Sequence, residues 1–370
     1  MIKILFVSPL PPPVHGSAMV SQYLKKSKII HDEFDCDFVN LSTSRRMDEI
    51  GKRNLRKIFR FLESYLLVFF KLLMHRYKLC YLAITCHGNG FLKDAPFVML
   101  CKMFGCKVII HQHNKGMSND DGRWPYRWLF PLVYRNTKVI LLSWYLYEDI
   151  AKVVNREQVL ICPNGIPEIL ESRNVPERNN LIPRLLFLSN LIESKGVYVL
   201  LDACKILKDK GYHFFCDFVG NETKEINRSV FEIAVEKRGL NRCVNYLGPQ
   251  YGVDKYRTFI NADIFVFPTY YYNECFPLVL LEAMQWRLPL VSSNEGGIPD
   301  IIQDGINGFR CKRKDVYSLV IALEKLLNDK GLREEMGNKG YERYHSQFTL
   351  ESFERRMRDI LQTLIIEDNH

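Results

Sequence analysis

The chain contains two successive series of short apolar segments, which together cover almost its whole length. Within each series, a segment with helical periodicity separates one apolar segment from the next. Near-continuous apolar strands that alternate with helices are typical of a parallel sheet covered on both faces. A proline-containing segment with few large apolar residues, Glu168 to Arg184, separates the two series. We therefore predict an α/β chain with two doubly wound, Rossmann-like parallel-sheet domains and a linker between them. The predicted strands cover residues 3–7, 36–41, 79–84, 107–111, 138–142, 159–161, 184–188, 214–219, 244–246, 264–267 and 290–292.

The length and composition agree with two globular domains and exclude several classes of protein. A chain of 370 residues with 47% hydrophobic and 25% charged residues is long enough for two cores and is not disordered. Eleven cysteines without regular spacing indicate a reducing compartment rather than a disulfide framework. The first apolar run is too short for a signal peptide, and charged residues interrupt the longest one, Ile58 to Met74. We expect a cytoplasmic protein without a membrane span.

Residues that directly follow strands are the first candidates for a site, because open parallel sheets bind ligands beyond the carboxyl ends of their strands. Gly16 and Ser17 open the first helix, where free backbone N–H groups would face an anion; a plain tight turn is the alternative. In the second half, Glu274 stands just before a helix, Pro277 suits its first turn, and Glu282 lies on its second turn. A single carboxylate in front of a helix often serves only to cap the helix N-terminus. Two carboxylates that bracket the start of the same helix favour a functional site.

The segment Glu-Cys-Phe-Pro-Leu-Val-Leu-Leu-Glu-Ala, from Glu274 to Ala283, resembles the retaining GT-B glycosyltransferases of family 4, the glycosyl transferases group 1. The motifs that follow, Leu-Pro-Leu-Val at 288–291 and Glu-Gly-Gly-Ile-Pro-Asp at 295–300, occur in the order of that family. Pro-Asn-Gly-Ile at 163–166 is similar to its turn at the domain junction, and residues 186–197 are similar to its phosphate-binding loop. The resemblance covers nearly the whole chain.

The resemblance implies a domain organisation. Residues 1–168 would bind the acceptor, and residues 184–347 would bind the nucleotide-sugar donor across a central cleft. A final helix at about 348–365 would pack back on the first domain.

The resemblance also implies roles for individual side chains. His113 and Glu274 would contact the donor sugar near the reacting centre, and Glu282 would accept hydrogen bonds from ribose hydroxyls. Lys195 would stabilise the negative charge that develops on the leaving phosphate. A buried structural histidine is the alternative for His113 and the preferred interpretation of His111. The other expected donor-binding residues are Gly16, Ser17, Asn190, Cys275, Phe276, Pro277 and Leu278.

One position departs from the family. The family commonly has Gly-Arg where this chain has Ser189-Asn190. Asn190 can donate a hydrogen bond but carries no charge. Either Lys195 acts alone on the diphosphate, or a basic residue of the first domain replaces the arginine.

We expect no metal ion and no cofactor. Asp35-Cys36-Asp37 mimics the Asp-x-Asp motif of metal-dependent glycosyltransferases of the other major fold, but it lies at the start of a predicted strand. His111 and His113 alternate on a strand without a third ligand nearby, and zinc needs three or four. The nucleotide sugar would be a substrate, with a UDP-sugar favoured over a GDP-sugar.

The net charge of +9 lies entirely in the first half of the chain. Residues 1–180 contain 26 basic and 16 acidic residues, against 25 and 26 in residues 181–370. Much of the excess lies in residues 51–78, where apolar residues repeat at helical spacing. Two interpretations stay open: the apolar face packs on the core with the basic face in solvent, or the basic end docks on an anionic membrane. The docking residues would be Lys52, Arg53, Arg56, Lys57 and Arg60.

Together these features predict a metal-independent, retaining hexosyltransferase that moves a sugar from a nucleotide donor to a hydroxyl acceptor. By family analogy the acceptor is a lipid-linked glycan of cell-surface polysaccharide biosynthesis, and the enzyme is peripheral on the inner face of the cell membrane. One alternative is a nucleotide-sugar epimerase of the same fold, which the spacing of Glu274 and Glu282 disfavours. Another is a catalytically silent membrane-docking protein that retains the nucleotide pocket. Nucleic-acid binding is disfavoured, since no recognition motif accompanies the charge.

Overall fold

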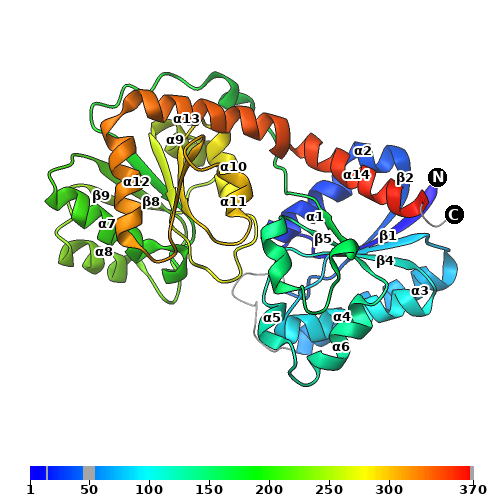
Figure 1. Ribbon diagram of the computed structural model, residues 1–370. Coiled ribbons are helices and arrows are strands. Elements are labelled where there is room, and N and C mark those ends of the chain that lie inside the picture. Colours follow the sequence, from blue (N-terminus) through cyan, green and yellow to red (C-terminus); the bar gives the residue numbers. More distant parts are fainter. Residues whose placement is uncertain (14–15, 45–54, 367–370) are drawn as a thin grey trace. The chain divides into compact units, whose positions relative to one another are not determined.

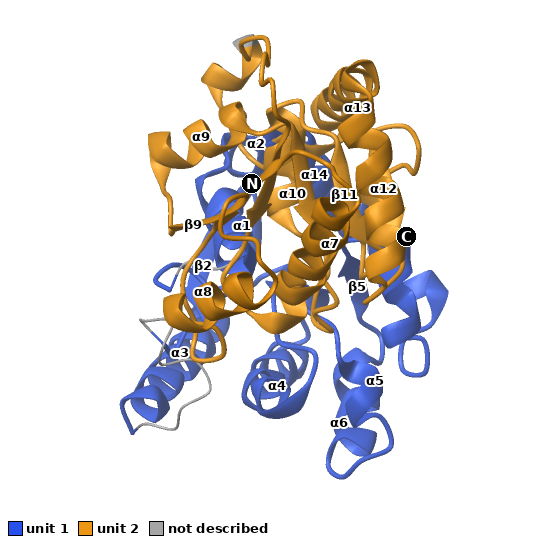
Figure 2. Cartoon of the chain, turned by 90° about the vertical axis from the view of Figure 1, so that its left-hand side faces the viewer, with its two compact units in different colours: residues 1–164, 350–370 blue, residues 165–349 orange. Residues whose placement is uncertain are grey.

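The structure is a computed structural model that describes residues 1–13, 16–44 and 55–366. The chain forms two compact units (Figure 1; Figure 2). Unit 1 comprises residues 1–164 and 350–370, and unit 2 comprises residues 165–349. Each unit contains a six-stranded parallel sheet with helices around it, so the predicted α/β class with two doubly wound sheets is confirmed.

In unit 1 the strand order is β2-β1-β3-β4-β5-β6. The chain goes from β1 outward to β2 and then crosses back to β3 on the other side of β1, so the topological switch of this sheet lies between β1 and β3. The strands are β1 (Ile2–Ser8), β2 (Phe34–Asn40), β3 (Leu79–Leu82), β4 (Lys107–His111), β5 (Lys138–Leu141) and β6 (Val159–Ile161). The α-helices are α1 (Gly16–Lys26), α2 (Lys28–Glu33), α3 (Leu55–Met74), α4 (Gly88–Met103), α5 (Met117–Asp120), α6 (Tyr126–Tyr134) and α14 (Leu350–Ile366).

The core of unit 1 includes a helix from the far end of the chain. In α14, Phe353, Met357 and Leu361 repeat at helical spacing and are fully buried. They belong to one hydrophobic cluster with Ile4 and Phe6 of β1. Figure 1 shows α14 beside α2, with which it is in contact. The last helix of the chain therefore completes the first unit.

In unit 2 the strand order is β12-β11-β10-β7-β8-β9, with the switch between β7 and β10. The strands are β7 (Arg184–Leu188), β8 (Phe215–Val219), β9 (Val244–Gly248), β10 (Ile264–Phe267), β11 (Leu290–Ser293) and β12 (Gly308–Cys311). The α-helices are α7 (Val197–Asp209), α8 (Arg228–Lys237), α9 (Gly252–Asn261), α10 (Leu278–Gln285), α11 (Ile298–Ile301), α12 (Val316–Asn328) and α13 (Lys330–Arg343). Strand β12 is absent from the predicted set.

The segment expected as a linker, 168–184, is instead part of unit 2, which begins at Gly165. Gln285 of α10 is completely buried, and its side-chain amide needs partners. Its Nε2 donates to the carbonyl of Pro167 at 2.9 Å, and its Oε1 accepts from the backbone N–H of Ile169 at 3.0 Å. Arg178 adds hydrogen bonds to the carbonyls of Trp286 and Arg287. These contacts attach the segment to the body of the unit.

Helix α3 bears on the two interpretations left open for the basic segment, because most of its apolar face does not pack on the core. Only Val68 and Leu72 of this helix are buried. The side that contacts the rest of unit 1 includes polar groups: Ser64 donates to the carbonyl of Asn40 at 3.0 Å, and Lys71 pairs with Asp37 of β2 at 2.8 Å. The apolar stripe is exposed to solvent. Figure 2 shows α3 at the margin of unit 1, beside α4.

Candidate functional site

The loops that follow β7 and β10 meet at the topological switch of unit 2, and they bring Lys195 and Glu274 together. Lys195 ends a short 3₁₀ helix, Glu193–Lys195, after β7, and Glu274 lies in the loop after β10. Their Nζ and Oε2 atoms are 2.6 Å apart. The two side chains retain only 16% and 10% of their exposure, so this is a largely desolvated ion pair. The sequence placed both residues after strands, and the fold joins them at the end of the sheet where ligands bind.

Aromatic rings surround the ammonium group of Lys195. Its Nζ lies 4.4 Å from the centre of the Tyr271 ring and 5.5 Å from that of Phe267. A cation over the face of an aromatic ring is stabilised by the negative potential of that face. The side chain of Lys195 is therefore fixed in position at the strand ends before any ligand arrives, which suits a group that stabilises developing charge.

The backbone at Glu274 is held by the loop after β11. Gly296 has a φ of 55°, and a Cβ at this position would lie 2.1 Å from the carbonyl oxygen of Glu274. The N–H of Gly297 donates to the carbonyl of Cys275 at 2.6 Å. Only a residue without a side chain allows this close approach of the two loops. Gly296 and Gly297 therefore hold the backbone at Glu274 in its position at the end of the sheet.

Helix α10 begins one residue later than expected, because Pro277 is its N-cap and Leu278 its first residue. Cys275 and Phe276 are each only 4% exposed, so their side chains are core residues and a ligand could meet only their backbone. On the second turn, Glu282 Oε1 lies 2.7 Å from Nζ of Lys255 on α9. Sequence reasoning missed Lys255, because only the tertiary fold brings α9 and α10 together.

Asn190 lies two residues after the end of β7 and is half-buried. Its Oδ1 accepts a hydrogen bond from Nδ2 of Asn221, in the loop after β8, at 3.2 Å. Two basic residues missed by the sequence reasoning follow β12 at the same end of the sheet. Arg313 donates to the carbonyl of Tyr270 at 2.9 Å and lies 3.3 Å from the buried carboxylate of Glu295. Nζ of Lys314 is 4.5 Å from the centre of the Tyr270 ring.

His111 and His113 lie at the carboxyl end of β4 in unit 1. His111 is fully buried, and its Nδ1 is 2.7 Å from the hydroxyl of Tyr81. Burial, together with the neighbouring His113, holds the pKa of His111 well below its usual range, so the ring is neutral. These contacts fit a structural histidine. His113 is half-buried after the strand, with its ring centre 4.0 Å from that of His111.

The first helix of unit 1 starts at Gly16, which is exposed, and Ser17 is half-buried beside it. Of the expected docking residues, Lys52 and Arg53 lie outside the described residues. The other three are on α3: Arg56 is exposed and Lys57 half-buried. The fifth, Arg60, does not point freely into solvent, since its Nη1 donates to the carbonyl of Thr43 at 2.8 Å.

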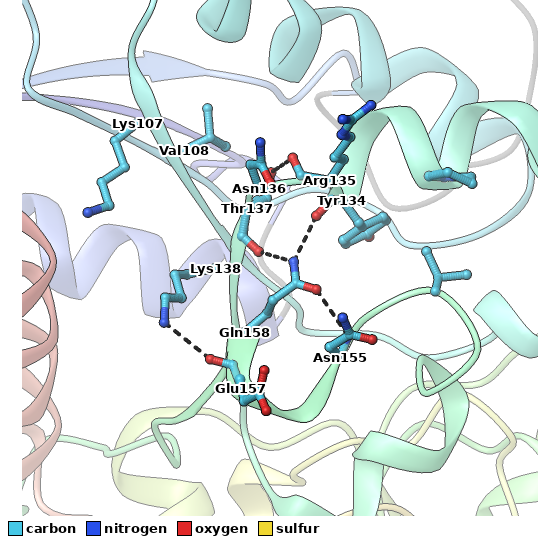
Figure 3. A pocket seen from close by; sticks show the side chains of 12 residues that line it. Lys107, Val108, Tyr134, Arg135, Asn136, Thr137, Lys138, Asn155, Glu157 and Gln158 are labelled. Carbon is cyan, nitrogen blue, oxygen red and sulfur yellow. Dashed lines mark hydrogen bonds between the residues drawn. The ribbon is translucent and has the colours of Figure 1, made fainter. Parts of the chain in front are cut away.

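A cavity of about 560 Å³ lies at the other end of the unit 1 sheet, near the amino ends of β4 and β5 (Figure 3). Within it, Gln158 donates to the carbonyls of Tyr134 and Thr137, and Lys138 donates to the carbonyl of Glu157 at 3.1 Å. These polar groups of the lining thus bind one another, while Lys107 donates to the carbonyl of Leu364 outside the lining. The cavity is at the end opposite to the one where parallel sheets bind ligands.

The described residues contain neither a candidate membrane span nor a candidate metal site. None of their helices is long and apolar enough to cross a membrane. In residues 1–13, 16–44 and 55–366, no group of three or more His, Cys, Asp or Glu side chains is placed to hold a metal ion. Independence from metal stays a prediction.

The family model described as "Glycosyl transferases group 1" matches residues 168–343, which is most of unit 2. The capsular polysaccharide biosynthesis glycosyltransferase CapM of Staphylococcus aureus is 26% identical over 181 residues, or 49% of this chain and 46% of CapM. The amylovoran biosynthesis glycosyltransferase AmsK of Erwinia amylovora is 33% identical over 149 residues, or 39% of this chain and 35% of AmsK. The matches thus span less than half the length of either relative.

Solved structures resemble the whole chain. A glycosyltransferase from Rickettsia africae ESF-5 has a TM-score of 0.75 at 15% identity and covers 98% of both chains. Anabaena Alr3699/HepE, solved in complex with UDP and glucose, has a TM-score of 0.72 at 16% identity, with 98% of this chain and 100% of that chain covered. At such identities the likeness shows the fold alone. The chain has the GT-B fold, and its second unit is the part that is similar to the glycosyl transferases group 1 family.

Proposed function

We propose that this chain is a retaining, metal-independent hexosyltransferase of glycosyltransferase family 4. It moves a sugar from a nucleotide donor, UDP-linked rather than GDP-linked, to a hydroxyl group of a glycan acceptor. The observation that carries the proposal is the desolvated pair of Lys195 and Glu274 at the strand switch of the unit that matches the family. Anabaena Alr3699/HepE, of the same fold, is solved in complex with UDP-glucose, which supports a UDP-sugar donor.

The pair supports this chemistry because a diphosphate would compete with Glu274 for the same ammonium group. Breaking the bond between an anomeric carbon and a nucleoside diphosphate leaves negative charge on the phosphate, and a fixed cation stabilises that charge. When the diphosphate takes Lys195, the carboxylate of Glu274 is released to accept hydrogen bonds from hydroxyls of the donor sugar. Donor binding would thus replace the ion pair by two new contacts, one between Lys195 and the diphosphate and one between Glu274 and the donor sugar.

Glu282 and Lys255 form a second ion pair, which the donor would also replace by contacts to itself. The ribose hydroxyls would donate to Glu282, whose Oε1 now accepts from Lys255 at 2.7 Å. Arg313 is our candidate for the charge that Asn190 lacks, because it is already at the strand ends, where it binds the carbonyl of Tyr270. This assigns the missing arginine to unit 2 rather than to the first domain.

The acceptor belongs to the proposal as well. Two relatives are named for capsular polysaccharide and amylovoran biosynthesis, which supports a surface polysaccharide as the product. We infer that unit 1 binds a lipid-linked glycan, with His113 beside the donor sugar, and docks on an anionic membrane surface through its basic residues. All eleven cysteines lie in the described residues and none forms a disulfide, which supports a cytoplasmic site of action.

The test is a transfer assay of the full chain with a panel of UDP- and GDP-hexoses and a lipid-linked glycan acceptor. We expect transfer from a UDP-sugar, unchanged by EDTA, with the α configuration of the donor preserved in the product by NMR. Glu274→Gln should lower kcat about 100-fold while UDP still binds, because it removes a contact made at the reacting sugar.

The matched control is Glu236→Gln, an exposed glutamate on α8, which should leave the rate unchanged. If Glu274→Gln binds donor and turns over as fast as the unaltered chain, the assigned role is wrong. Binding of UDP without transfer from any donor would favour the catalytically silent alternative.

A further inference from the structure

Helix α3 exposes a continuous apolar stripe along its whole length. Nine large apolar side chains of its twenty residues each retain between 45% and 74% of their exposure. They recur at intervals of three and four residues, which places them on one side of a helix about 30 Å long. The nine are Leu55, Ile58, Phe59, Leu62, Leu66, Leu67, Phe70, Leu73 and Met74.

The opposite side of α3 is anchored to unit 1 through polar contacts. Arg60, Ser64 and Lys71 bind the carbonyl of Thr43, the carbonyl of Asn40 and the carboxylate of Asp37. An amphipathic helix of a globular unit normally buries its apolar stripe and leaves its polar residues in water. The inward side of α3 also packs apolar groups, since Val68 and Leu72 are buried and Phe61 and Tyr65 contact Phe97 of α4. The nine exposed side chains are additional apolar surface that unit 1 does not cover, so the stripe is available to a partner outside the described chain.

The charge around the stripe distinguishes between partners. Residues 55–78 contain six basic residues and one acidic residue. Arg56 near one end of the helix, and Arg76 and Lys78 just beyond the other end, are exposed. A second copy of this chain would present the same positive charge and would be repelled. Anionic lipid headgroups would be attracted at both ends of the helix while the acyl region receives the stripe.

We propose that α3 lies in the plane of a lipid bilayer, with its apolar stripe inserted at the boundary between headgroups and acyl chains. The partner is thus the bilayer itself, and burial of apolar surface supplies most of the binding. Phe104, at the end of α4, contacts Phe69 with ring centres 5.7 Å apart and is also exposed, so it extends the inserted surface. This inference deepens the membrane docking proposed above, and it replaces charge with apolar burial as the main attraction.

The experiment is flotation of the full chain with vesicles of neutral phosphatidylcholine and of phosphatidylcholine mixed with phosphatidylglycerol, at low and high salt. No donor or acceptor is present, so the result does not depend on transfer activity. We expect binding to both kinds of vesicle that persists at high salt. The double variant Leu62→Asp/Leu66→Asp should bind at least about tenfold more weakly, because it places two charges in the acyl region.

The matched control is Val230→Asp/Ile233→Asp, on the exposed side of α8 in unit 2, which should float like the unaltered chain. Thermal unfolding of each variant shows that it is folded. Amide hydrogen exchange gives an independent readout, since vesicles should protect α3 and not α8. Binding only to anionic vesicles, lost at high salt and unaffected by Leu62→Asp/Leu66→Asp, would overturn insertion. A dimer in sedimentation that the same variant dissociates, without vesicle binding, would also overturn it.

Discussion

Unit 2 buries charged side chains at the ends of its strands, whereas unit 1 leaves apolar side chains exposed along α3. The Lys195 and Glu274 side chains retain 16% and 10% of their exposure, while Leu55 and Phe59 retain 73% and 71%. Both arrangements cost free energy in the folded chain, because charges lose water and apolar groups keep it. Under our two proposals the difference has a reason: unit 2 offers a fixed cation to an anionic ligand, and unit 1 offers an apolar surface to a bilayer.

Aspartate substitutions should separate α3 from an ordinary amphipathic helix most strongly. In α12, Leu323 is fully buried, and Leu323→Asp should lower the free energy of unfolding by about 3–5 kcal/mol through a lost core side chain and a buried charge. In α3, Leu62 is 47% exposed, and Leu62→Asp should change it by no more than about 0.5 kcal/mol. Urea denaturation measures both values. Equal losses would mean that the α3 stripe is part of a core.

Removal of the buried cation Lys195 tests the role of the desolvated charges in unit 2. Lys195→Met should lower kcat/KM for transfer by about 100- to 1,000-fold and weaken UDP binding, because the leaving phosphate loses its fixed positive charge. Lys205→Met, which removes an exposed cation from α7, should leave both quantities unchanged. Transfer kinetics and calorimetric titration with UDP measure them. Similar behaviour of the two variants would remove Lys195 from the mechanism.

The smallest expected effect concerns the polar anchor of α3. Burial raises the pKa of Asp37, but hydrogen bonds from Lys71 and Tyr77 outweigh burial and lower the pKa to about 2. A pKa below that of the unfolded chain adds stability above about pH 4, and this stability is lost as the pH falls toward about 2. Because Asp37 is partly exposed, we expect a loss of only about 1 kcal/mol.

Asp37→Asn should abolish that part of the pH dependence. Ser64→Ala removes an uncharged anchor of the same helix and should leave the pH dependence intact. Urea denaturation at a series of acidic pH values distinguishes them. An unchanged slope in Asp37→Asn would show that the charge of Asp37, with its partners Lys71, Tyr77 and Lys3, contributes nothing to folding.

The strands of both sheets could be predicted from the sequence because apolar runs of parallel strands are local signals. Strand β12 could not, since Gly308-Phe309-Arg310-Cys311 has a charged residue inside it and is too short to show a period. The candidate pair of Lys195 and Glu274 followed from the resemblance and the position after strands. Their mutual contact needed the strand order, which brings β7 and β10 side by side.

Other features depend on contacts between distant segments. Helical periodicity showed that α3 has two faces, but not which one unit 1 would cover. The covered face combines polar contacts to Asp37 and the carbonyl of Asn40 with the buried side chains of Val68 and Leu72, and all of these depend on segments far along the chain. The partner of Glu282 likewise comes from another helix, so no spacing along the chain identifies Lys255.

The arrangement around Glu274 also depends on Gly296, because glycine has no Cβ atom. With 2.1 Å between its would-be Cβ and the carbonyl of Glu274, a single methyl group there would push the whole loop upward. Every ionisable group would remain present in such a chain, yet the loop that carries Glu274 would be displaced relative to Lys195. Gly296→Ala is therefore a route to an inert protein of unaltered charge, in which membrane attachment can be studied apart from chemistry.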